Sequence, residues 1–192
     1  MIQLADYLHS TFEVSSSDIE SITPYFKPVR LKKNEYFLRS GNRVTQIAFI
    51  TSGVMRNYSI NPEGNEVVHY MTTDGDFNTV YQYFINEKPC PENIQAVTSC
   101  ELAVIEREDF FRIREKSKVF ETLVENLVLD GLNCKEKRLR SYLAENAQKR
   151  YANLLTHQPK IIQYSPMQYI ASYLGITRET LSRIRNRKVS RV

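Results

Sequence analysis

The spacing of apolar residues predicts strands over much of the first half of the chain, between Val29 and Ile105. Short runs in this region are rich in β-branched and aromatic residues, which favour strands. The clearest runs cover residues 46–50, 54–60, 66–71 and 101–105. Four glycines punctuate the region at intervals of 12, 11 and 11 residues: Gly41, Gly53, Gly64 and Gly75. Regular strands and turns at this spacing are typical of an antiparallel sandwich or barrel.

Helices are predicted on either side of these strands. Roughly residues 1–28 look helical, with Ser17 as the cap of a helix over residues 18–22 and with Pro24 and Pro28 ending it. A long helix is expected from about Val119, because no proline occurs before Pro159 and apolar residues recur at helical spacing. Those apolar residues are Phe120, Leu123, Val124, Leu127, Val128 and Leu132.

The long helix also carries a heptad pattern. Residues spaced by sevens, with two more offset by four, are Phe120, Leu127 and Cys134, then Val124 and Gly131. This is the pattern of a coiled-coil seam between two subunits. The alternative is that the apolar stripe only packs on the chain's own β domain.

Two short helices joined by a tight turn are predicted between residues 165 and 187. Ser165 is suited to cap the first helix, with Pro166 at its first position, where a missing N–H costs nothing. Gly175 suits the left-handed conformation that ends a helix, and Thr177 can cap the second helix. The shared apolar face would consist of Ile170, Leu174, Ile176, Leu181 and Ile184, with the small Ala171 at the crossing. This spacing is that of a helix-turn-helix.

The outer face of the second helix carries side chains that read bases. They are Arg178, Glu179, Ser182, Arg183 and Asn186. Arginine pairs with guanine in the major groove and glutamate accepts from cytosine, and recognition helices make such contacts in their first turns. The pattern predicts double-stranded DNA as a partner. The alternative is a helical hairpin whose charged face only meets water.

Charge is distributed unevenly along the chain. Residues 135–192 hold 13 Lys+Arg against 3 Glu, a balance of +10, and the whole chain is only +4, which leaves −6 for residues 1–134. A mildly acidic front and a strongly basic end fit a module that neutralises phosphates attached to a module with another task. The basic run continues from Arg185 to the last residue, where it can equally be a solvated tail.

Composition is that of an ordinary globular protein. A length of 192 residues allows one or two domains, with 42% hydrophobic and 25% charged residues. No apolar run approaches the roughly 18 residues of a membrane span, and no leader is recognised, so we expect a cytoplasmic protein without membrane contact. Three separated cysteines, Cys90, Cys100 and Cys134, fit reduced thiols better than disulfides.

No catalytic or metal-binding pattern emerges from the residues. His9, His69 and His157 are scattered, so a metal enzyme of the same β architecture would lack its histidine cluster. There is no Ser/His/Asp arrangement, phosphate-cradling glycine loop or paired-carboxylate signature. We therefore expect neither enzymatic activity nor a cofactor or metal site.

Taken together, these elements resemble the bacterial Crp/Fnr transcription regulators, and the resemblance covers nearly the whole chain. It implies an α+β fold with an N-terminal double-stranded β-roll (a jelly roll of the cyclic-nucleotide-binding type) over residues 1–116. A dimerisation helix over residues 117–143 and a helix-turn-helix domain over residues 144–192 would follow. The implied partners are DNA, a second copy of the chain in a homodimer and RNA polymerase. Two-fold dimers of this kind match palindromic half-sites.

The family's Arg-Glu-Thr-x-x-x-Arg signature stands intact in the second helix of the pair. By the resemblance, Arg178, Glu179 and Arg183 would contact bases and Thr180 a phosphate. The full set of residues expected to bind DNA is Thr177, Arg178, Glu179, Thr180, Ser182, Arg183 and Arg185. The β-hairpin wing that usually follows in the family is not expected, because eight residues without glycine follow Ile184. This keeps open a ligand-binding or protein-interaction module that does not read DNA sequence.

The family's β-roll often holds a cyclic nucleotide in a Gly-Glu-Leu element followed by Arg-Ser or Arg-Thr. Gly75, Asp76 and Phe77 resemble the first element, but Cys90 and Pro91 stand where the second belongs, and no arginine lies between Arg56 and Arg107. A buried phosphate needs a cation and several donors, so the absence of two such contacts would weaken binding by roughly a hundredfold. We predict a degenerate pocket around Gly75, Asp76, Phe77 and Cys90 that is not controlled by cyclic AMP.

Other modes of control stay open. The protein could be controlled by a cyclic nucleotide, or by a different small or acidic ligand near Tyr70, Tyr81, Tyr83 or Lys88. It could also be regulated without a ligand, by its abundance or by a partner protein. The family's iron–sulfur sensors carry an N-terminal cysteine cluster, and residues 1–89 contain no cysteine, which excludes that branch. Cys134 could form an intersubunit disulfide, although a lone cysteine is more often a small packing residue.

Overall fold

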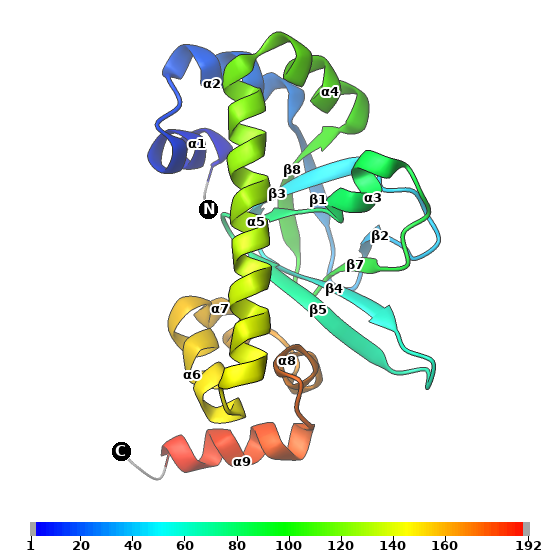
Figure 1. Cartoon of the computed structure of the whole chain (residues 1–192), viewed down its shortest axis with the longest axis vertical. Coiled ribbons are helices and arrows are strands. Elements are labelled where there is room, and N and C mark those ends of the chain that lie inside the picture. Colours follow the sequence, from blue (N-terminus) through cyan, green and yellow to red (C-terminus); the bar gives the residue numbers. More distant parts are fainter. Residues whose placement is uncertain (1–2, 190–192) are drawn as a thin grey trace.

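The computed structural model of the protein describes residues 3–189, with side chains for residues 3–186 (Figure 1). Two four-stranded antiparallel sheets form its centre, one in the order β1-β8-β3-β6 and the other in the order β2-β7-β4-β5. The strands are β1 (Lys27–Leu31), β2 (Tyr36–Leu38), β3 (Gln46–Ser52), β4 (Val54–Ile60), β5 (Glu66–Thr73), β6 (Phe77–Asn78), β7 (Asn93–Ala96) and β8 (Cys100–Glu106).

The core lies between the two sheets. Phe49 and Ile50 of β3 are fully buried, as are Met55 of β4 and Ile94 of β7, and all four belong to one apolar cluster. Such a core forms when two sheets turn their apolar faces toward each other. The four runs predicted as strands coincide with β3, β4, β5 and β8, so the prediction of an antiparallel sandwich is confirmed.

Helices surround the sheets and continue beyond them. Before the sheets come α1 (Leu4–Phe12), α2 (Ser16–Ile22) and the 3-10 helix η1 (Thr23–Tyr25), and within them lies α3 (Tyr81–Asn86). After the last strand follow α4 (Arg107–Lys116), α5 (Lys118–Ala144), α6 (Ala147–His157), α7 (Pro159–Tyr164), α8 (Met167–Leu174) and α9 (Arg178–Val189).

The N-terminal prediction holds for α1 and α2 but not for the cap or for the end of the helical region. The hydroxyl of Ser15 accepts the Asp18 N–H at 3.2 Å, and Ser17 lies inside α2, so the predicted cap at Ser17 is wrong. Three consecutive serines can each cap, and only the chain path selects among them. Pro28 lies within β1 rather than ending a helix. Proline is tolerated there because β1 is an edge strand.

Helix α5 runs for 27 residues, about 40 Å, and joins the sheets to the C-terminal helices (Figure 1). Its cap is Ser117, whose hydroxyl accepts the Phe120 N–H at 3.1 Å. Its first turns bury Phe120, Leu123 and Val124 in the core of the β domain. The predicted seam through Phe120 and Val124 is therefore wrong at those positions, because the β domain occupies that face of the helix.

Helices α7 and α8 pack on the outer face of the second sheet, and α6 and α9 pack on these two helices. Their apolar residues share a cluster with Val54 and Tyr58 of β4 and with Val68 and Met71 of β5. The contributing residues from these helices include Tyr151, Leu154, Ile161, Ile170, Ala171, Leu174, Leu181 and Ile184. The C-terminal helices are thus attached to the β domain through α7 and α8.

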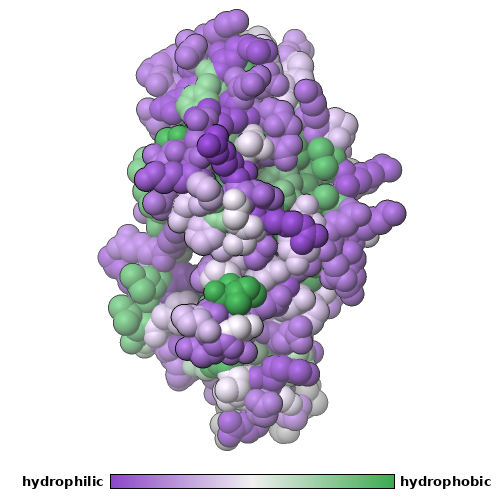
Figure 2. All heavy atoms as spheres, turned by 90° about the vertical axis from the view of Figure 1, so that its right-hand side faces the viewer, coloured by the Kyte–Doolittle hydropathy of each residue, from purple (hydrophilic) through white to green (hydrophobic). Residues whose placement is uncertain are grey.

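The face that bears the β4–β5 hairpin is largely hydrophilic, with apolar side chains in small separate patches (Figure 2). Scattered patches of this kind are normal on a globular surface. Within residues 3–189, no helix is long and apolar enough to cross a membrane.

Candidate nucleic-acid interface and adjoining cavity

The turn between α8 and α9 depends on Gly175. Its φ is 65°, in the left-handed region, and its N–H reaches the carbonyl oxygens of Ala171 and Ser172. A Cβ at this position would lie 2.9 Å from the ring of Tyr142, a distance that real contacts do not show. The predicted role of Gly175 as the residue that ends the first helix is confirmed, and close packing adds a second reason for glycine.

The ends of the two helices agree with the sequence in one case and not in the other. Thr177 caps α9, since its hydroxyl accepts the Thr180 N–H at 3.2 Å. Helix α8 has Pro166 as its cap residue and no side-chain cap, whereas Ser165 ends α7. The prediction that Ser165 caps α8 is wrong, because α8 begins one residue later and the buried Ser165 hydroxyl bonds no backbone N–H of that helix among the described residues.

The two helices cross through the predicted apolar residues. Ile170, Ala171 and Leu174 of α8 and Leu181 and Ile184 of α9 are buried in one cluster. Small Ala171, 2% exposed, lies at this crossing. The side of α9 opposite to this cluster is consequently turned to solvent.

That outer side carries the residues predicted to contact DNA. Thr177, Arg178, Glu179, Arg183 and Arg185 are exposed, and Thr180 and Ser182 are half-buried. None of the three arginines forms an ion pair within the part of the chain that the structure describes. Their charges are thus available to an external partner.

Two local contacts shape this surface. The Arg183 guanidinium donates to the Thr180 hydroxyl at 3.1 Å, which holds both residues of the signature together. Hydrogen bonds from its own backbone N–H and from Thr177 lower the pKa of Glu179, so its carboxylate is ionised at neutral pH. An ionised acceptor between cationic side chains is the chemistry that distinguishes base edges in a major groove.

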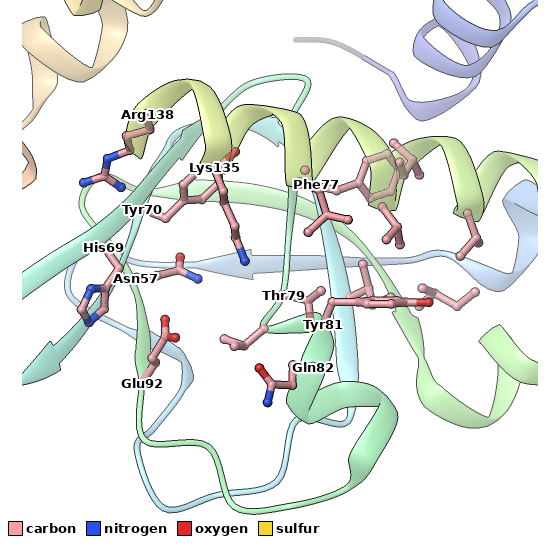
Figure 3. Close-up of a pocket in the computed structure, with 18 of the residues that line it drawn as sticks. Asn57, His69, Tyr70, Phe77, Thr79, Tyr81, Gln82, Glu92, Lys135 and Arg138 are labelled. Atoms are coloured by element: carbon pink, nitrogen blue, oxygen red, sulfur yellow. The ribbon is translucent and has the colours of Figure 1, made fainter. Parts of the chain in front are cut away.

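A cavity of about 850 Å³ lies between α5 and the β domain (Figure 3). Its apolar part is lined by Leu4, Leu8, Ile22, Phe26, Phe110, Phe120, Leu123 and Val124, among others. Its polar part is lined by Asn57, His69, Tyr70, Glu92, Lys135 and Arg138, and Thr79, Tyr81 and Gln82 add further polar groups. Ser172 and Gly175 of the C-terminal helices also line it.

Of the four residues predicted for an effector pocket, Phe77 lines this cavity. Gly75 and Asp76 form the turn after β5, where the Gly75 N–H donates to the Ile50 carbonyl and the Asp76 carboxylate accepts the Thr73 N–H. The structure therefore gives these two residues a turn role.

Cys90 also lies away from the cavity lining, fully buried in the β-domain core. Its N–H donates to the Asn42 carbonyl at 2.8 Å, and its thiol accepts the Glu92 N–H. Burial raises the pKa of this thiol, so it stays protonated at neutral pH. The structure thus places Cys90 in a packing role.

Sequence reasoning found part of the cavity and missed its cations. Tyr70 and Tyr81 line it as anticipated, but Tyr83 and Lys88 do not belong to the lining, and Lys135 and Arg138 were not anticipated. A signal existed, because the cavity-lining positions 128, 131, 135, 138 and 142 recur at helical spacing along α5. It could be interpreted only once the face turned to the β domain was known.

Arg138 connects the cavity to the C-terminal helices. Its guanidinium donates to the Tyr173 carbonyl and the Tyr142 hydroxyl, both at 3.0 Å, and approaches the Val68 carbonyl at 3.5 Å. It also stacks over the Tyr173 ring at 4.0 Å. A cation at the C-terminal end of α8 complements the negative end of that helix's dipole. One side chain of α5 thereby touches β5, α8 and the cavity.

Comparison with known proteins gives this arrangement a family context. Residues 28–117 match the cyclic nucleotide-binding domain family. FixK2 from Bradyrhizobium japonicum matches with a TM-score of 0.77 at 14% identity over 86% of this chain and 85% of that one. A protein named as a Crp/Fnr family transcriptional regulator, from Eubacterium rectale, matches with a TM-score of 0.71 at 19% identity over 96% and 88%.

The chain has the Crp/Fnr fold. A third structure with this fold, the c-di-GMP responsive regulator CLP from Xanthomonas campestris, matches with a TM-score of 0.65 at 17% identity, over 92% of each chain. No curated protein matches the sequence. The resemblance inferred from the motifs is thus confirmed for the Crp/Fnr fold, and the β-roll, long helix and C-terminal helices occupy the order it implied.

Proposed function

We propose that the protein is a dimeric, sequence-specific DNA-binding transcription regulator and not an enzyme. The observation that carries the proposal is the outer side of α9, where the exposed Arg178, Glu179 and Arg183 project from a helix anchored by its opposite face. Helices α8 and α9 would act as a helix-turn-helix, with α9 in the major groove. Similarity in fold to proteins named as regulators of transcription or gene expression supports the same function.

The dimer is proposed on a different face of α5 from the heptad pattern in the sequence. Four exposed leucines follow one another along this helix: Leu129 (57% exposed), Leu132 (57%), Leu139 (60%) and Leu143 (81%). We call them the exposed leucine row. Their spacing of three, seven and four residues is that of a coiled-coil seam. A second copy of α5 would bury the row and place two α9 helices in a two-fold arrangement suited to palindromic DNA.

Control by a ligand other than cyclic AMP is part of the proposal. Gly75, Asp76 and Cys90 are engaged in turn and core contacts, and Pro91 offers no N–H to a phosphate. The Xanthomonas protein of similar fold is described as responsive to c-di-GMP, so this fold serves more than one ligand. The cavity beside α5 is the proposed effector site.

The proposal is tested by selecting random duplex DNA with the purified protein at a stated salt concentration. Wild type should enrich a pseudo-palindrome, and Arg183→Ala should weaken binding by about 1–3 kcal/mol and relax specificity at one base of each half-site. Arg30→Ala, which removes an arginine from β1 with an 86% exposed side chain, is the matched control and should behave as wild type. Retention without any motif, or equal selection by Arg183→Ala, would contradict sequence reading by α9.

A further inference from the structure

The cavity beside α5 is divided into an apolar part and a cationic part. Val124 lines the apolar part and Lys135 the polar part, and they lie about 16 Å apart along the helix axis. Figure 3 shows Lys135 extending from α5 into the cavity on the side of Asn57. A molecule filling both parts must therefore be elongated, with a polar group at one end.

Charge limits what that polar group can be. The charged side chains among the described lining residues are Lys135, Arg138 and Glu92, an excess of one positive charge. Lys135 forms no ion pair within residues 3–186, so its ammonium group has no protein counter-ion there. One negative charge balances the polar part, whereas a second would face the carboxylate of Glu92.

Apart from Thr79, Tyr81 and Gln82, the remaining lining is mostly apolar and offers few partners for a nucleotide body. Leucine, isoleucine, valine and phenylalanine side chains from α1, α2, α4 and α5 form the opposite part. A ribose and a base would leave polar atoms unpaired against these walls, at a cost for each unpaired group. An alkyl chain would bury its surface there favourably.

We propose that the cavity binds a monocarboxylate with an elongated apolar body, its carboxylate held by Lys135, and that Arg138 transmits its binding to α8. The effector role of this molecule rests on the proposed function, but its binding does not. A carboxylate accepts charge-assisted hydrogen bonds that are stronger than those of the neutral Tyr173 carbonyl. Binding would draw Arg138 from Tyr173 and loosen α8, and with it the turn at Gly175 that precedes α9.

The binding test uses calorimetry on the full-length protein with decanoate, decanol and cyclic AMP as probes. Decanoate should bind to the wild-type protein. Decanol should bind to wild type about tenfold or more weakly than decanoate does, and Lys135→Gln should bind decanoate about tenfold or more weakly than wild type does. This is the reduction expected when one charge-assisted hydrogen bond is removed. Lys137→Gln is the matched control, because Lys137 is an exposed residue of α5 that does not line the cavity. This variant should keep wild-type affinity. Circular dichroism would establish that each variant is folded.

Three results would overturn the ligand assignment: no decanoate binding at millimolar concentration, equal affinity for decanol, or tighter binding of cyclic AMP.

The effect of ligand binding on α8 is measured by hydrogen exchange of the Val68 amide. This amide donates to the Ser172 hydroxyl at 2.9 Å and so reports contact between β5 and α8. Decanoate should speed this exchange in wild type, whereas Arg138→Gln, which lacks the contact with Tyr173 from the start, should already exchange faster and show no further increase when saturated with decanoate. Unaltered exchange in saturated wild type would overturn the role of Arg138.

These measurements contain no DNA. A protein that binds decanoate as expected but selects no DNA motif would refute the proposed regulator and leave the cavity assignment intact. A protein that selects a DNA motif but does not bind decanoate would refute the cavity assignment and leave the proposed regulator intact.

Discussion

Arg56 is a buried cation, 2% exposed, at the meeting point of the second sheet and α8. Its guanidinium bonds both oxygens of Glu66, at 2.5 and 3.0 Å, and the Gln95 side-chain oxygen at 2.7 Å. It also lies over the rings of Tyr58, at 4.0 Å, and Tyr169 of α8, at 3.6 Å. A buried charge is tolerated when it is paired and hydrogen-bonded in this way. Arg56 thus fixes how α8 rests on the sheet.

Removing the counter-ion of Arg56 should be costly. Glu66→Ala would leave the cation buried, and we expect a decrease of about 2–3 kcal/mol in the free energy of unfolding, somewhat below a fully buried pair because the Glu66 side chain is 40% exposed. Glu101→Ala breaks a pair with Arg30, whose side chain is 86% exposed, and should cost less than about 1 kcal/mol. Urea unfolding measures both, and equal decreases would refute the role of Arg56.

The contribution of the β5–β6 turn to folding stability depends on pH through Asp76. Burial, opposed by the Thr73 N–H and reinforced by the charge of Asp74, raises the pKa of Asp76 from 3.8 to about 6. Between these values the folded state binds more protons than the unfolded state. The contribution of Asp76 to stability therefore falls as pH rises through this window, and above it the ionised carboxylate opposes folding.

Asp76→Asn should consequently stabilise the protein at pH 8, by about 2–3 kcal/mol, and have little effect below pH 4. Asn can still accept the Thr73 N–H through its amide oxygen. Asp74→Asn is the matched control with the opposite sign: burial raises the pKa of Asp74, but the Lys160 hydrogen bond and others outweigh it and lower the pKa. Thermal unfolding at the two pH values would decide, and the same sign for both variants would contradict the assignment.

At the scale of elements, α5 has two apolar faces with different partners. Phe120, Leu123 and Val124 pack into the β domain, whereas the exposed leucine row is open to solvent in a single chain, with Leu132 and Leu139 also bordering the cavity. Four exposed leucines on one helix are costly to leave in water, at about 25 cal/mol for each Å² of apolar surface. The row is the part of the helix that a second subunit would cover.

Charges placed in that row should separate the subunits. Leu129→Glu/Leu143→Glu changes two row residues that do not belong to the cavity lining, so ligand binding should be unaffected. Sedimentation should show a dimer for wild type and a monomer for this variant. Leu155→Glu, at a 36% exposed position of α6, should remain dimeric. A wild-type monomer at micromolar concentration, or a dimer that survives both changes, would contradict the proposed seam.

For the whole molecule, the separation of charge should govern DNA affinity. Residues 135–192 carry 13 Lys+Arg against 3 Glu, and the helices that hold most of them form one end of the molecule (Figure 1). Positive charge gathered at one end releases counter-ions from DNA on binding. The free energy of counter-ion release adds to that of the base contacts of α9 and depends on salt. Discrimination between DNA sequences comes from the base contacts and depends much less on salt.

Binding to the selected site should therefore weaken by about tenfold or more between 50 and 200 mM salt. Arg185→Gln, at an exposed position of α9, should lower the slope of log K against log salt by about 1 for each phosphate that the variant no longer neutralises. Arg30→Gln on β1 should leave the slope unchanged. Fluorescence anisotropy over a salt series measures both, and a flat dependence would count against phosphate binding at this end of the molecule.

The sequence by itself determined most of the architecture, because its signals were local. Alternating apolar runs specified the strands, a proline-free stretch with helical spacing specified α5, and Gly175 and Thr177 specified the turn between α8 and α9. Each of these features depends on residues within one turn or one strand. The outer face of α9 was likewise readable, since a helix that buries Leu181 and Ile184 must expose the residues between them.

Tertiary structure alone decided which apolar faces were already covered and which polar groups met. A heptad pattern cannot tell a subunit seam from a contact with the chain's own sheets, and the β domain took Phe120 and Val124. Gly75 and Asp76 resembled a ligand cassette, but their backbone and carboxylate close a turn. Lys135 and Arg138 face a cavity because residues of β5, 60 or more positions earlier, supply its opposite wall. Such contacts depend on the packing of distant segments, which no local pattern encodes.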